Sequence, residues 1–559
     1  MTGQQAWLPE QNKTMKRPVS GWHFLIGAVA VYVAVLFNGV VAVRRFAALQ
    51  ASHEGAVGLI LLELILVLSF TAATLYLASI AGRKVFKGVA AAILFISAVC
   101  AYYMLFFKVV IGYGIIQATL STDVELSKEV IGLGVIGFVL VFGILPAVAV
   151  FRVRLPPGER RSRLLAFALC ILTGASVFYL YPLLLQKVDD KPQAQAPSPL
   201  GVIAHSYVPS NWITGLALSG LNAYEGSARQ RLLIQPADKF AYRLPGDVEG
   251  TYLVLVIGES ARSDRMGLLG HSRQNTPELS KMQNLAAMRA MSCNTSTKLS
   301  LQCMFVRPEA VDDGGASGRQ TVSEGMVFSV LKKLGFTTDL FAMQGEVWFY
   351  NSVEANFYKH RELIYAEQRN IGKPIDDLLL IPELEESLAR HPRGKHVVVL
   401  HTKGSHHLYT LRYPRAYAWY KPECMGTEIP CGAEELLNSY DNSIAYTDHF
   451  LGQVIETLKG KKALMIYTSD HGESIGEQGH LHGAPKDMAP AEQRMVPLII
   501  WASQPFLQTP GNAAHFAALQ SRKGEIASHE NLFDSILGCL GVESANGGIN
   551  AQRNLCRSN

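Results

Sequence analysis

The chain of 559 residues is longer than one ordinary domain, so we expect it to fold as at least two. Its formal net charge of +5 is too small a surplus of basic residues to indicate a nucleic-acid partner. Hydrophobic residues make up 49% of the composition and are concentrated in the first third, which indicates a membrane protein rather than a wholly soluble one.

Apolar stretches long enough to cross a hydrocarbon core of about 30 Å, at 1.5 Å per residue of helix, occupy that first third. The five stretches are Trp22–Val43, Val57–Ile80, Gly88–Ile111, Val130–Phe151 and Leu164–Leu185. Because a cleaved signal peptide would not be followed by four more such segments, we expect the first to be retained. Buried helices of a soluble protein are the alternative. Glu63, inside the second stretch, is expected to contact a neighbouring helix.

The basic residues favour one orientation across the membrane. They gather before the first stretch, after the second, and after the fourth in "FRVRLPPGERRSR" (151–163). By the positive-inside rule these ends are cytoplasmic, so five crossings would place everything after Lys187 outside the cytoplasm.

The cysteines agree with that orientation. Cys100 and Cys170 lie within predicted spans and are interpreted as small apolar residues, whereas the other six all follow Lys187, as expected in an oxidising compartment. Six cysteines allow about 15 connectivities. Short separations along the chain favour the pairs Cys293–Cys303, Cys424–Cys431 and Cys539–Cys556.

Two segments connect the spans to the remainder of the chain. Residues 188–200, "VDDKPQAQAPSPL", have the composition of a linker. Residues 206–226 mix aromatic and aliphatic residues with few charges and are predicted to form a helix at the membrane surface, with an ordinary core helix as the alternative. The predicted domains are therefore 1–187, 188–250 and 251–559.

From Thr251 onward, short continuous apolar runs alternate with helical segments. The runs are "TYLVLVIG", "TTDLFAM", "HVVVLHT", "KALMIYTS" and "VPLIIWA". Runs of this kind are typical of strands buried on both faces, so we predict a largely parallel sheet between helices, an α/β domain. Sites in such sheets form beyond the carboxyl ends of the strands.

Residues that can bind a metal follow three of these strands. Glu259 follows the first, His401 to His407 follow the third, and the adjacent Asp470 and His471 follow the fourth. Carboxylate oxygen and imidazole nitrogen are zinc ligands, and a catalytic zinc keeps one position for a nucleophile. The loop "SCNTSTKLSLQC" (292–303) offers hydroxyls for that position, with Thr295, Ser296, Thr297 and Ser300 as the candidates. An isolated Asp-His pair is more often a helix cap, but here it combines with Glu259 and this loop.

Five motifs in fixed order resemble the membrane-bound phosphoethanolamine transferases of Gram-negative bacteria. They are "VIGES-AR" with "TPEL", "SCNTSTKLSLQCMF", "HTKGSHHLYTLRYP", "NSYDNSIAYTDHF" and "SDHGESIGEQGHLHG…PAEQRMVPLIIW". The resemblance implies five transmembrane helices and a periplasmic domain of alkaline phosphatase/sulfatase type. The stretches 109–133, "VPSNW" and "GKPIDDLLL" are similar to the branch that acts on the Kdo sugar of Kdo2-lipid A.

The resemblance also implies roles for individual residues. Thr297 would be the nucleophile, and Zn²⁺ would be held by Glu259, Asp470, His471 and Thr297 itself. His406 and His482 would bind the head group or a second divalent metal. Lys298 would offset charge on the phosphoryl oxygens, although a solvated lysine is the alternative. Glu473 would orient the loop, and His480 is expected to have no role in the site.

The implied reaction takes phosphoethanolamine from phosphatidylethanolamine to lipopolysaccharide through a covalent threonine intermediate. The implied protein is a monomer of the bacterial inner membrane with its catalytic domain in the periplasm. The chain departs from the family pattern in two places. It lacks a cysteine pair in "FAMQGEVWFYN" (341–351), which bears on acceptor choice, and Glu125 stands two residues after Asp123 rather than three.

Four alternative functions can be compared with this one. A sulfatase would need a modifiable Cys or Ser in a C/S-x-P-x-R context, which "TSTKLS" lacks. Transfer to the glucosamine phosphates of lipid A, or phosphoglycerol transfer to a periplasmic glycan, would use the same metal–threonine site. A non-catalytic sensor would be expected to have lost a ligand, and all four residues are present.

Overall fold

The computed structural model describes residues 21–50, 55–109, 111–121, 131–186, 201, 206–230, 233–244, 248–313, 320–425, 431–477, 480–484, 486 and 489–557. Its contacts divide the chain into a helical unit (Met1–Ala101 and Gly137–Asp190) and a sheet unit (Tyr102–Ile136 and Lys191–Asn559). The described residues between 102 and 136 thus group with the sheet unit, whereas the hydropathy-based boundary lies at residue 187. The predicted linker 188–200, Asp123 and Glu125 lie outside the described residues.

Four helical segments of the described chain are long and apolar enough to cross a membrane: Ala56–Ala81, Arg83–Phe106, Leu133–Arg152 and Arg160–Leu184. They correspond to α3 (Ala56–Ala81), to α4 (Arg83–Phe106), to α7 (Leu133–Val139) continued through a π-helical turn (Leu140–Ile144) into α8 (Leu145–Arg152), and to α9 (Arg160–Gln186). A fifth candidate, Trp22–Leu36 with Gly39–Ala47, is bent by 44° and includes α1 (Trp22–Val31) and α2 (Gly39–Gln50).

One predicted span is displaced toward the N-terminus in the structure. The stretch Gly88–Ile111 corresponds to α4, which begins at Arg83 and ends at Phe106. The difference arises because hydropathy marks the apolar residues, whereas the helix is set by backbone hydrogen bonds that continue through the basic residues before Gly88.

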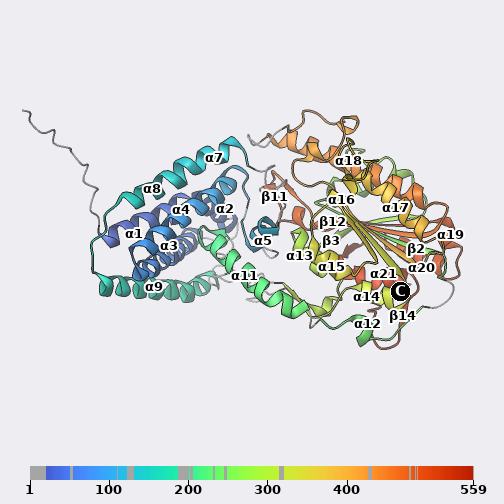
Figure 1. Cartoon of the computed structure of the whole chain (residues 1–559), viewed down its shortest axis with the longest axis horizontal. Helices are drawn as coiled ribbons and strands as arrows, with labels where there is room; N and C mark the ends of the chain where they lie inside the picture. Colours follow the sequence, from blue (N-terminus) through green and yellow to red (C-terminus); the bar gives the residue numbers. More distant parts are fainter. Residues whose placement is uncertain are drawn as a thin grey trace, which may run out of the picture. The chain divides into compact units, whose positions relative to one another are not determined.

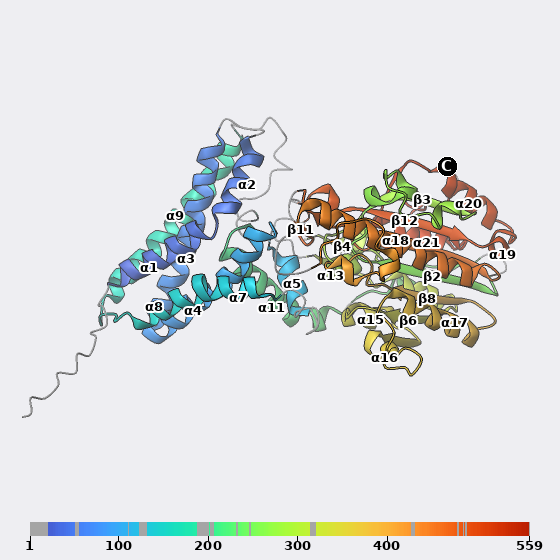
Figure 2. The same cartoon turned by 90° about the horizontal axis from the view of Figure 1, so that it is seen from above.

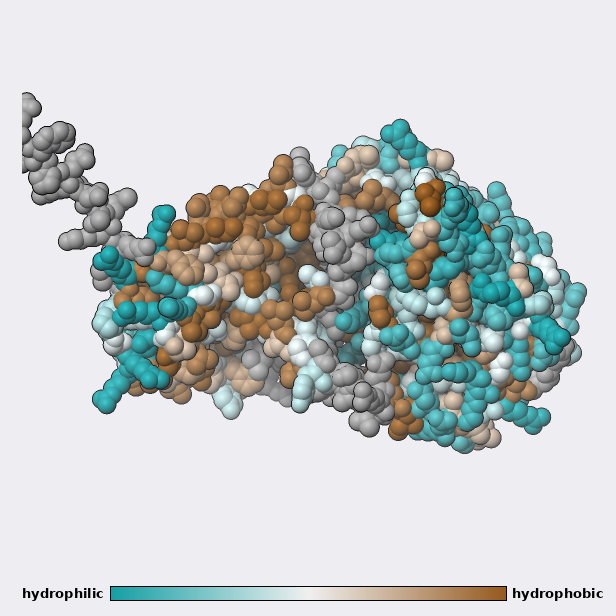
Figure 3. All heavy atoms as spheres, viewed as in Figure 1, coloured by the Kyte–Doolittle hydropathy of each residue, from teal (hydrophilic) through white to brown (hydrophobic). Residues whose placement is uncertain are grey.

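The helical unit buries a charged contact between three helices. Arg45 of α2 donates to Glu63 Oε1 of α3 at 2.7 Å, and the Tyr181 hydroxyl of α9 donates to the same oxygen at 2.5 Å. Glu63 is fully buried, so the prediction that it contacts neighbouring helices is confirmed. Hydrophobic residues cover much of the visible outer face of these helices in Figure 3. Exposed leucines such as Leu165, Leu169 and Leu172 of α9 are expected of a surface in contact with lipid.

An eight-stranded sheet organises the sheet unit, in the order β13-β3-β12-β9-β2-β8-β6-β7. Figure 1 shows this sheet with helices around it. The strands are β13 (Ile526–Ser528), β3 (Leu285–Met291), β12 (Met495–Ala502), β9 (Lys462–Ser469), β2 (Thr251–Gly258), β8 (His396–His401), β6 (Thr337–Ala342) and β7 (Phe357–His360). Only β12 is antiparallel to its neighbours β3 and β9. The largely parallel sheet is therefore confirmed, and its five predicted strands are β2, β6, β8, β9 and β12.

Each face of the sheet carries its own hydrophobic core. Leu253, Leu255 and Ile257 of β2 pack on one side with residues of α14, α15 and α21, and Tyr252, Val254 and Val256 pack on the other with α17 and α18. Figure 2 shows α15, α17, α18 and α21 around the sheet from above. Burial on both faces explains why β2 reads as a continuous apolar run.

The helices of the sheet unit are mostly short. They are α5 (Tyr113–Ser121), α11 (Ser210–Gln230), α12 (Pro236–Lys239), α13 (Thr297–Cys303), α14 (Val327–Lys333), α15 (Val347–Val353), α16 (Arg361–Tyr365), α17 (Leu380–Arg390), α18 (Ala433–Leu458), α19 (Gln504–Leu507), α20 (Asn512–Ser521) and α21 (Leu532–Cys539). The helix predicted within 206–226 is α11, which packs against α5. Its role at a membrane surface stays a prediction.

Short strand pairs and disulfides complete the sheet unit. The pairs are β1 (Tyr242–Arg243) with β14 (Glu543–Ser544), β4 (Val311–Asp312) with β5 (Thr321–Val322), and β10 (Ser474–Ile475) with β11 (His480–Leu481). The disulfides are Cys293–Cys303, Cys424–Cys431 and Cys539–Cys556, the pairs that short separations predicted. Cys100 and Cys170 are free thiols within α4 and α9.

Candidate active site

The carboxyl ends of β2, β8 and β9 bring the predicted metal ligands together. Gly258 of β2 pairs with Ser469 of β9, so Glu259 and Asp470, the next residues of the two strands, leave the sheet side by side. The Asp470 backbone N–H donates to the Gly258 carbonyl at 3.0 Å, which holds the two chain ends in register. Glu259, Asp470 and His471 are all fully buried.

The loop after β8 closes over Glu259 because it contains a glycine at the point of contact. Gly404 has a φ of +50°, and a Cβ there would lie 2.7 Å from the Glu259 carbonyl oxygen. Ser405 then donates its backbone N–H to that carbonyl at 2.9 Å. The carboxylate of Asp377 accepts from the backbone N–H groups of Lys403 and Gly404 at 2.6 and 2.9 Å, which fixes the start of the loop that carries His406.

The hydroxyl-rich loop is tied to the site from several directions. The disulfide Cys293–Cys303 links its start to the end of α13. The Thr295 hydroxyl donates to the Ala484 carbonyl at 2.5 Å, and Gly483 donates its N–H to the Thr295 carbonyl at 2.7 Å. These contacts attach the loop to the segment that follows Asp470 and His471.

Of the four candidate hydroxyls in this loop, only Thr297 faces the buried ligands. Thr295 is engaged with Ala484, Ser296 occupies the N-cap position of α13 without a capping hydrogen bond from its side chain, and Ser300 is fully buried. Thr297 Oγ1 lies 3.0 Å from Glu259 Oε2 and 3.2 Å from His471 Nε2. Its side chain is partly exposed, so the hydroxyl combines buried partners with access from outside.

The tautomer of His471 follows from its second nitrogen. Nδ1 lies 2.8 Å from the Gly472 carbonyl oxygen, which can only accept, so Nδ1 carries the proton. Burial lowers the pKa of His471 to about 4, and the ring is neutral at pH 7. Nε2 therefore presents a lone pair to Glu259 Oε1 and Asp470 Oδ2, each at 3.3 Å.

A cation fits among these atoms. The lone pair of His471 Nε2 faces two carboxylate oxygens, and among the described residues Asp470 Oδ2 is buried without any hydrogen-bond donor. Burial and the Glu259 carboxylate raise the pKa of Asp470 well above its usual range, a conflict that a positive ion would relieve. Ligands about 2.0 Å from a tetrahedral zinc lie about 3.3 Å from one another. The measured separations of 3.0 to 3.3 Å match that value.

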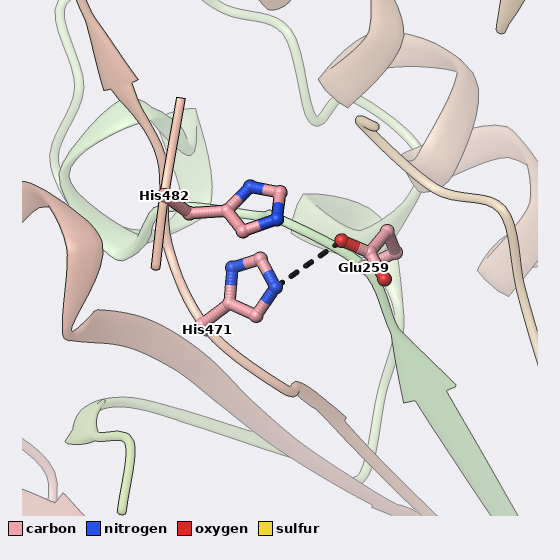
Figure 4. A group of neighbouring side chains, drawn as sticks. All are labelled: Glu259, His471 and His482. Atoms are coloured by element: carbon pink, nitrogen blue, oxygen red, sulfur yellow. Dashed lines mark ion pairs between the residues drawn. The ribbon is translucent and has the colours of Figure 1, made fainter. Parts of the chain in front are cut away.

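His482 stands beside this cluster, directly after β11. Figure 4 shows its ring next to that of His471, and the ring centroids are 4.1 Å apart. Its Nδ1 contacts Glu473 Oε2 at 2.9 Å. Burial disfavours the charged ring, but the carboxylates of Glu473 and Glu259 together outweigh burial and raise the pKa of His482. The ring of His406 lies 6.0 Å from that of His482, so both histidines border the cluster.

The other predicted residues take different places. Glu473, expected to orient the loop, contacts His482 directly. Lys298 follows Thr297 at the start of α13 and acts electrostatically on Glu346, with no contact to the ligand cluster among the described interactions. His480 pairs with Ile475 in a short hairpin, and its side chain lies outside the described residues.

Gln344 is a site residue that the sequence reasoning missed. Its side-chain nitrogen donates to Glu259 Oε2 at 2.8 Å. It follows β6, whose end lies beside that of β8, so the same rule of strand ends could have found it. It escaped notice because glutamine is neither a metal ligand nor a titratable group.

A second group of metal-capable side chains lies at the other end of the strands, formed by Asp339, His391 and His396. Ser387 Oγ is 2.8 Å from Asp339 Oδ2 and 2.9 Å from His396 Nε2. A hydroxyl has one hydrogen, so Ser387 donates to the carboxylate and accepts from Nε2–H, which leaves that nitrogen no lone pair for a metal. With Arg390 also bound to Asp339 at 2.8 Å, the group is a structural hydrogen-bond network.

Comparisons with known proteins agree with this geometry. The sulfatase family model matches residues 251–542, and the model described as phosphoethanolamine transferase EptA/EptB matches residues 69–189. The Kdo(2)-lipid A phosphoethanolamine 7''-transferase of Escherichia coli (strain K12) is 43% identical over 543 residues, which cover 94% of this chain and 95% of that protein. The protein of the same name from Salmonella typhimurium (strain LT2) is 44% identical over 547 residues, with the same coverage of 94% and 95%.

Among solved structures, the integral membrane lipooligosaccharide phosphoethanolamine transferase A (EptA) of Neisseria meningitidis is similar along its length. The TM-score is 0.80 at 25% identity, over 97% of this chain and 100% of that chain. The soluble domain of the same Neisseria protein matches 58% of this chain at 27% identity and a TM-score of 0.50.

Proposed function

Because the chain belongs to the phosphoethanolamine transferase family, we propose that it transfers phosphoethanolamine from phosphatidylethanolamine to the Kdo sugar of Kdo2-lipid A. The choice of acceptor is supported by two relatives, 43% and 44% identical over 94% of the chain, that carry this acceptor in their names. The donor is the membrane lipid that carries the transferred group.

The observation that carries the proposal is the position of the Thr297 hydroxyl. It is partly exposed, 3.0 Å from Glu259 Oε2 and 3.2 Å from His471 Nε2. A hydroxyl that contacts buried candidate metal ligands, at the carboxyl ends of parallel strands, has the arrangement of an activated nucleophile. Glu259 Oε2 accepts the hydrogen bond of the Thr297 hydroxyl and is the nearest site that could take the hydroxyl proton.

The reaction would proceed in two displacements. Thr297 Oγ1 attacks the phosphorus of phosphatidylethanolamine, the bond from phosphorus to the diacylglycerol oxygen breaks, and diacylglycerol leaves with a proton. Phosphoethanolamine is then bound to Thr297. A Kdo hydroxyl then attacks the same phosphorus, the bond from phosphorus to Thr297 Oγ1 breaks, and the proton of the Kdo hydroxyl goes to the released Thr297 oxygen.

Glu259, Thr297, Asp470 and His471 would hold a zinc ion in this mechanism. When bound, the ion would supply the positive charge that lowers the pKa of the Thr297 hydroxyl and offsets charge on the phosphoryl oxygens. His406 and His482 border the site and would contact the head group or a second divalent metal. Lys298, next to Thr297, would contribute further positive charge to the phosphoryl oxygens.

The apolar helices would bring this site to its lipid substrates. We take the bent segment of α1 and α2 as one span, which makes five spans and places the sheet unit in the periplasm, with the helical unit in the inner membrane. We keep 1–187, 188–250 and 251–559 as the functional division of the chain, and propose that it acts as a monomer.

Mass spectrometry of lipopolysaccharide tests the acceptor. Cells with and without the protein are compared, and the lipid A and core oligosaccharide are analysed separately. Phosphoethanolamine added to the Kdo fragment is the expected result. Its appearance on the glucosamine phosphates instead would contradict the proposed acceptor, and transfer of phosphoglycerol would contradict the proposed donor.

A further inference from the structure

Gln344 lies in a chain of hydrogen bonds that reaches from the metal site into the core. Its side-chain nitrogen is 2.8 Å from Glu259 Oε2, 2.8 Å from the Thr402 carbonyl oxygen and 3.3 Å from His401 Nε2. A carboxylate and a carbonyl only accept hydrogen bonds, so the NH₂ end of the amide, rather than its oxygen, must face Glu259. The two amide hydrogens are shared among three acceptors.

The tautomer of His401 follows from the same argument. The Tyr350 hydroxyl donates its single hydrogen to the Gln344 backbone carbonyl at 3.0 Å. Its oxygen can therefore only accept from His401 Nδ1, at 2.9 Å, so Nδ1 carries the proton and Nε2 presents its lone pair to the Gln344 amide. His401 is fully buried and Tyr350 nearly so, which keeps water out of the chain.

Glu259 is thereby held at both carboxylate oxygens. Ser260 Oγ donates to Oε1 at 2.7 Å, and Gln344 donates to Oε2 at 2.8 Å. With a buried donor on each oxygen, rotation of the carboxylate would break a hydrogen bond in a buried place, at a cost in free energy. The remaining lone pairs are directed at His471 and Thr297.

We propose that Gln344 is a positioning residue that orients the Glu259 carboxylate for the metal site. His401 and Tyr350 in turn fix the side-chain amide of Gln344. The inference rests on the proposed function in one respect, namely that Glu259 is a metal ligand. Residues that hydrogen-bond to metal ligands fix the orientation of those ligands, and removing such a residue lowers metal affinity about 10- to 100-fold.

The test measures the Zn²⁺ dissociation constant of the purified full chain by competition with a chromophoric chelator. Gln344→Met keeps a similar side-chain length and removes the NH₂ donor, and it should weaken zinc binding about 10- to 100-fold. Tyr350→Phe keeps the ring and removes one hydroxyl, and it should give a smaller loss. Because both act through the same amide, the double variant should bind zinc about as Gln344→Met alone does.

Tyr358→Phe is the matched control. The ring of Tyr358 lies 5.2 Å from that of Tyr350, but its side chain is 38% exposed and stands outside the chain of hydrogen bonds. It should leave zinc affinity unchanged. Melting temperatures are recorded for every variant, so that a general loss of stability is recognised.

The outcomes separate the two proposals. Zinc binding by Gln344→Met within about twofold of the native chain, or a double variant whose losses multiply, would overturn the positioning role and leave the proposed function standing. A folded native chain that fails to bind zinc would overturn both.

Discussion

The hydroxyl of Thr297 lies 3.2 Å from His471 Nε2, the ring nitrogen that carries no proton because Nδ1 donates its own to the Gly472 carbonyl. The two residues are far apart in the sequence, and they meet because α13 begins where β9 ends. A lone pair and a hydroxyl at this distance, with two carboxylates beside them, form a site that can bind a cation and activate an oxygen.

Replacing Thr297 by Ala should abolish the covalent phosphoethanolamine adduct and lower transfer by at least about 10³-fold, since the Thr297 hydroxyl is the loop oxygen that contacts Glu259 and His471. Intact-protein mass spectrometry after incubation with phosphatidylethanolamine detects the adduct. Thr295→Ala is the control, because Thr295 donates to the Ala484 carbonyl and should tolerate the change with adduct formation retained. An adduct that persists in Thr297→Ala would remove this residue from the role.

Removing the metal should stop adduct formation. A chelator is expected to abolish the adduct in the full chain, and added Zn²⁺ is expected to restore it. Without a cation, three buried hydrogen-bond acceptors, namely Glu259 Oε1, Asp470 Oδ2 and His471 Nε2, face one another. Asp470→Asn removes one charge from a proposed ligand. It should weaken zinc binding by at least roughly 10-fold, which is the smallest loss expected when a residue that only supports a metal ligand is removed. Full activity after exhaustive chelation would show that these residues act without a metal.

Two disulfides allow a matched comparison of stability with reactivity. Losing Cys293–Cys303 through serine substitutions should destabilise the protein by about 2–4 kcal/mol and slow adduct formation, because this bond braces the loop of Thr297. Losing Cys539–Cys556, which closes a longer loop of 17 residues, should lower the melting temperature at least as much but leave the adduct rate unchanged. Equal slowing in both variants would mean that the first disulfide acts only through global stability.

His529 should make stability depend on pH. Its Nδ1 accepts from the Cys293 N–H at 3.3 Å and its Nε2 donates to the Ser469 carbonyl at 3.0 Å, so the buried ring is neutral. Burial lowers its pKa to about 4, against an unfolded value of about 6.5, so the unfolded chain binds the proton more readily. Stability is therefore lost as the pH falls from about 6.5 to about 4, by up to roughly 3 kcal/mol from this residue.

Melting curves of the native chain and of His529→Gln across that pH range check the sign. The native chain should lose more stability than the variant as the pH falls. Parallel profiles would mean that His529 is not protonated on unfolding in this range.

Much of the fold could be predicted from local patterns of apolar residues in the sequence. The strands β2, β6, β8, β9 and β12 are continuous apolar runs because both faces of the sheet are covered by helices. β3 was missed because "LAAMRAM" alternates buried and partly exposed residues, and β7 and β13 were missed because edge strands are short. The antiparallel direction of β12 was also beyond prediction, since direction depends on how the chain returns to the sheet.

Some residues of the candidate site could likewise be predicted from the sequence, and others could not. Glu259, Asp470 and His471 were found because their residue types bind metals and they follow predicted strands. Gln344 was passed over because its contribution lies in a hydrogen bond to another residue, which composition does not reveal. The choice of Thr297 among four hydroxyls came from family resemblance, and the structure gives a physical reason for it in the distances to Glu259 and His471.

The sequence by itself determined the segregation of apolar helices from an α/β part and the pairing of neighbouring cysteines, because hydropathy, period and short separation are local properties of a chain. Only the tertiary structure decided the strand order, the convergence of residues 259, 297 and 471, and the support of Glu259 by Gln344. Those depend on contacts between segments far apart in sequence, whose geometry is set by the packing of the whole sheet rather than by any one segment.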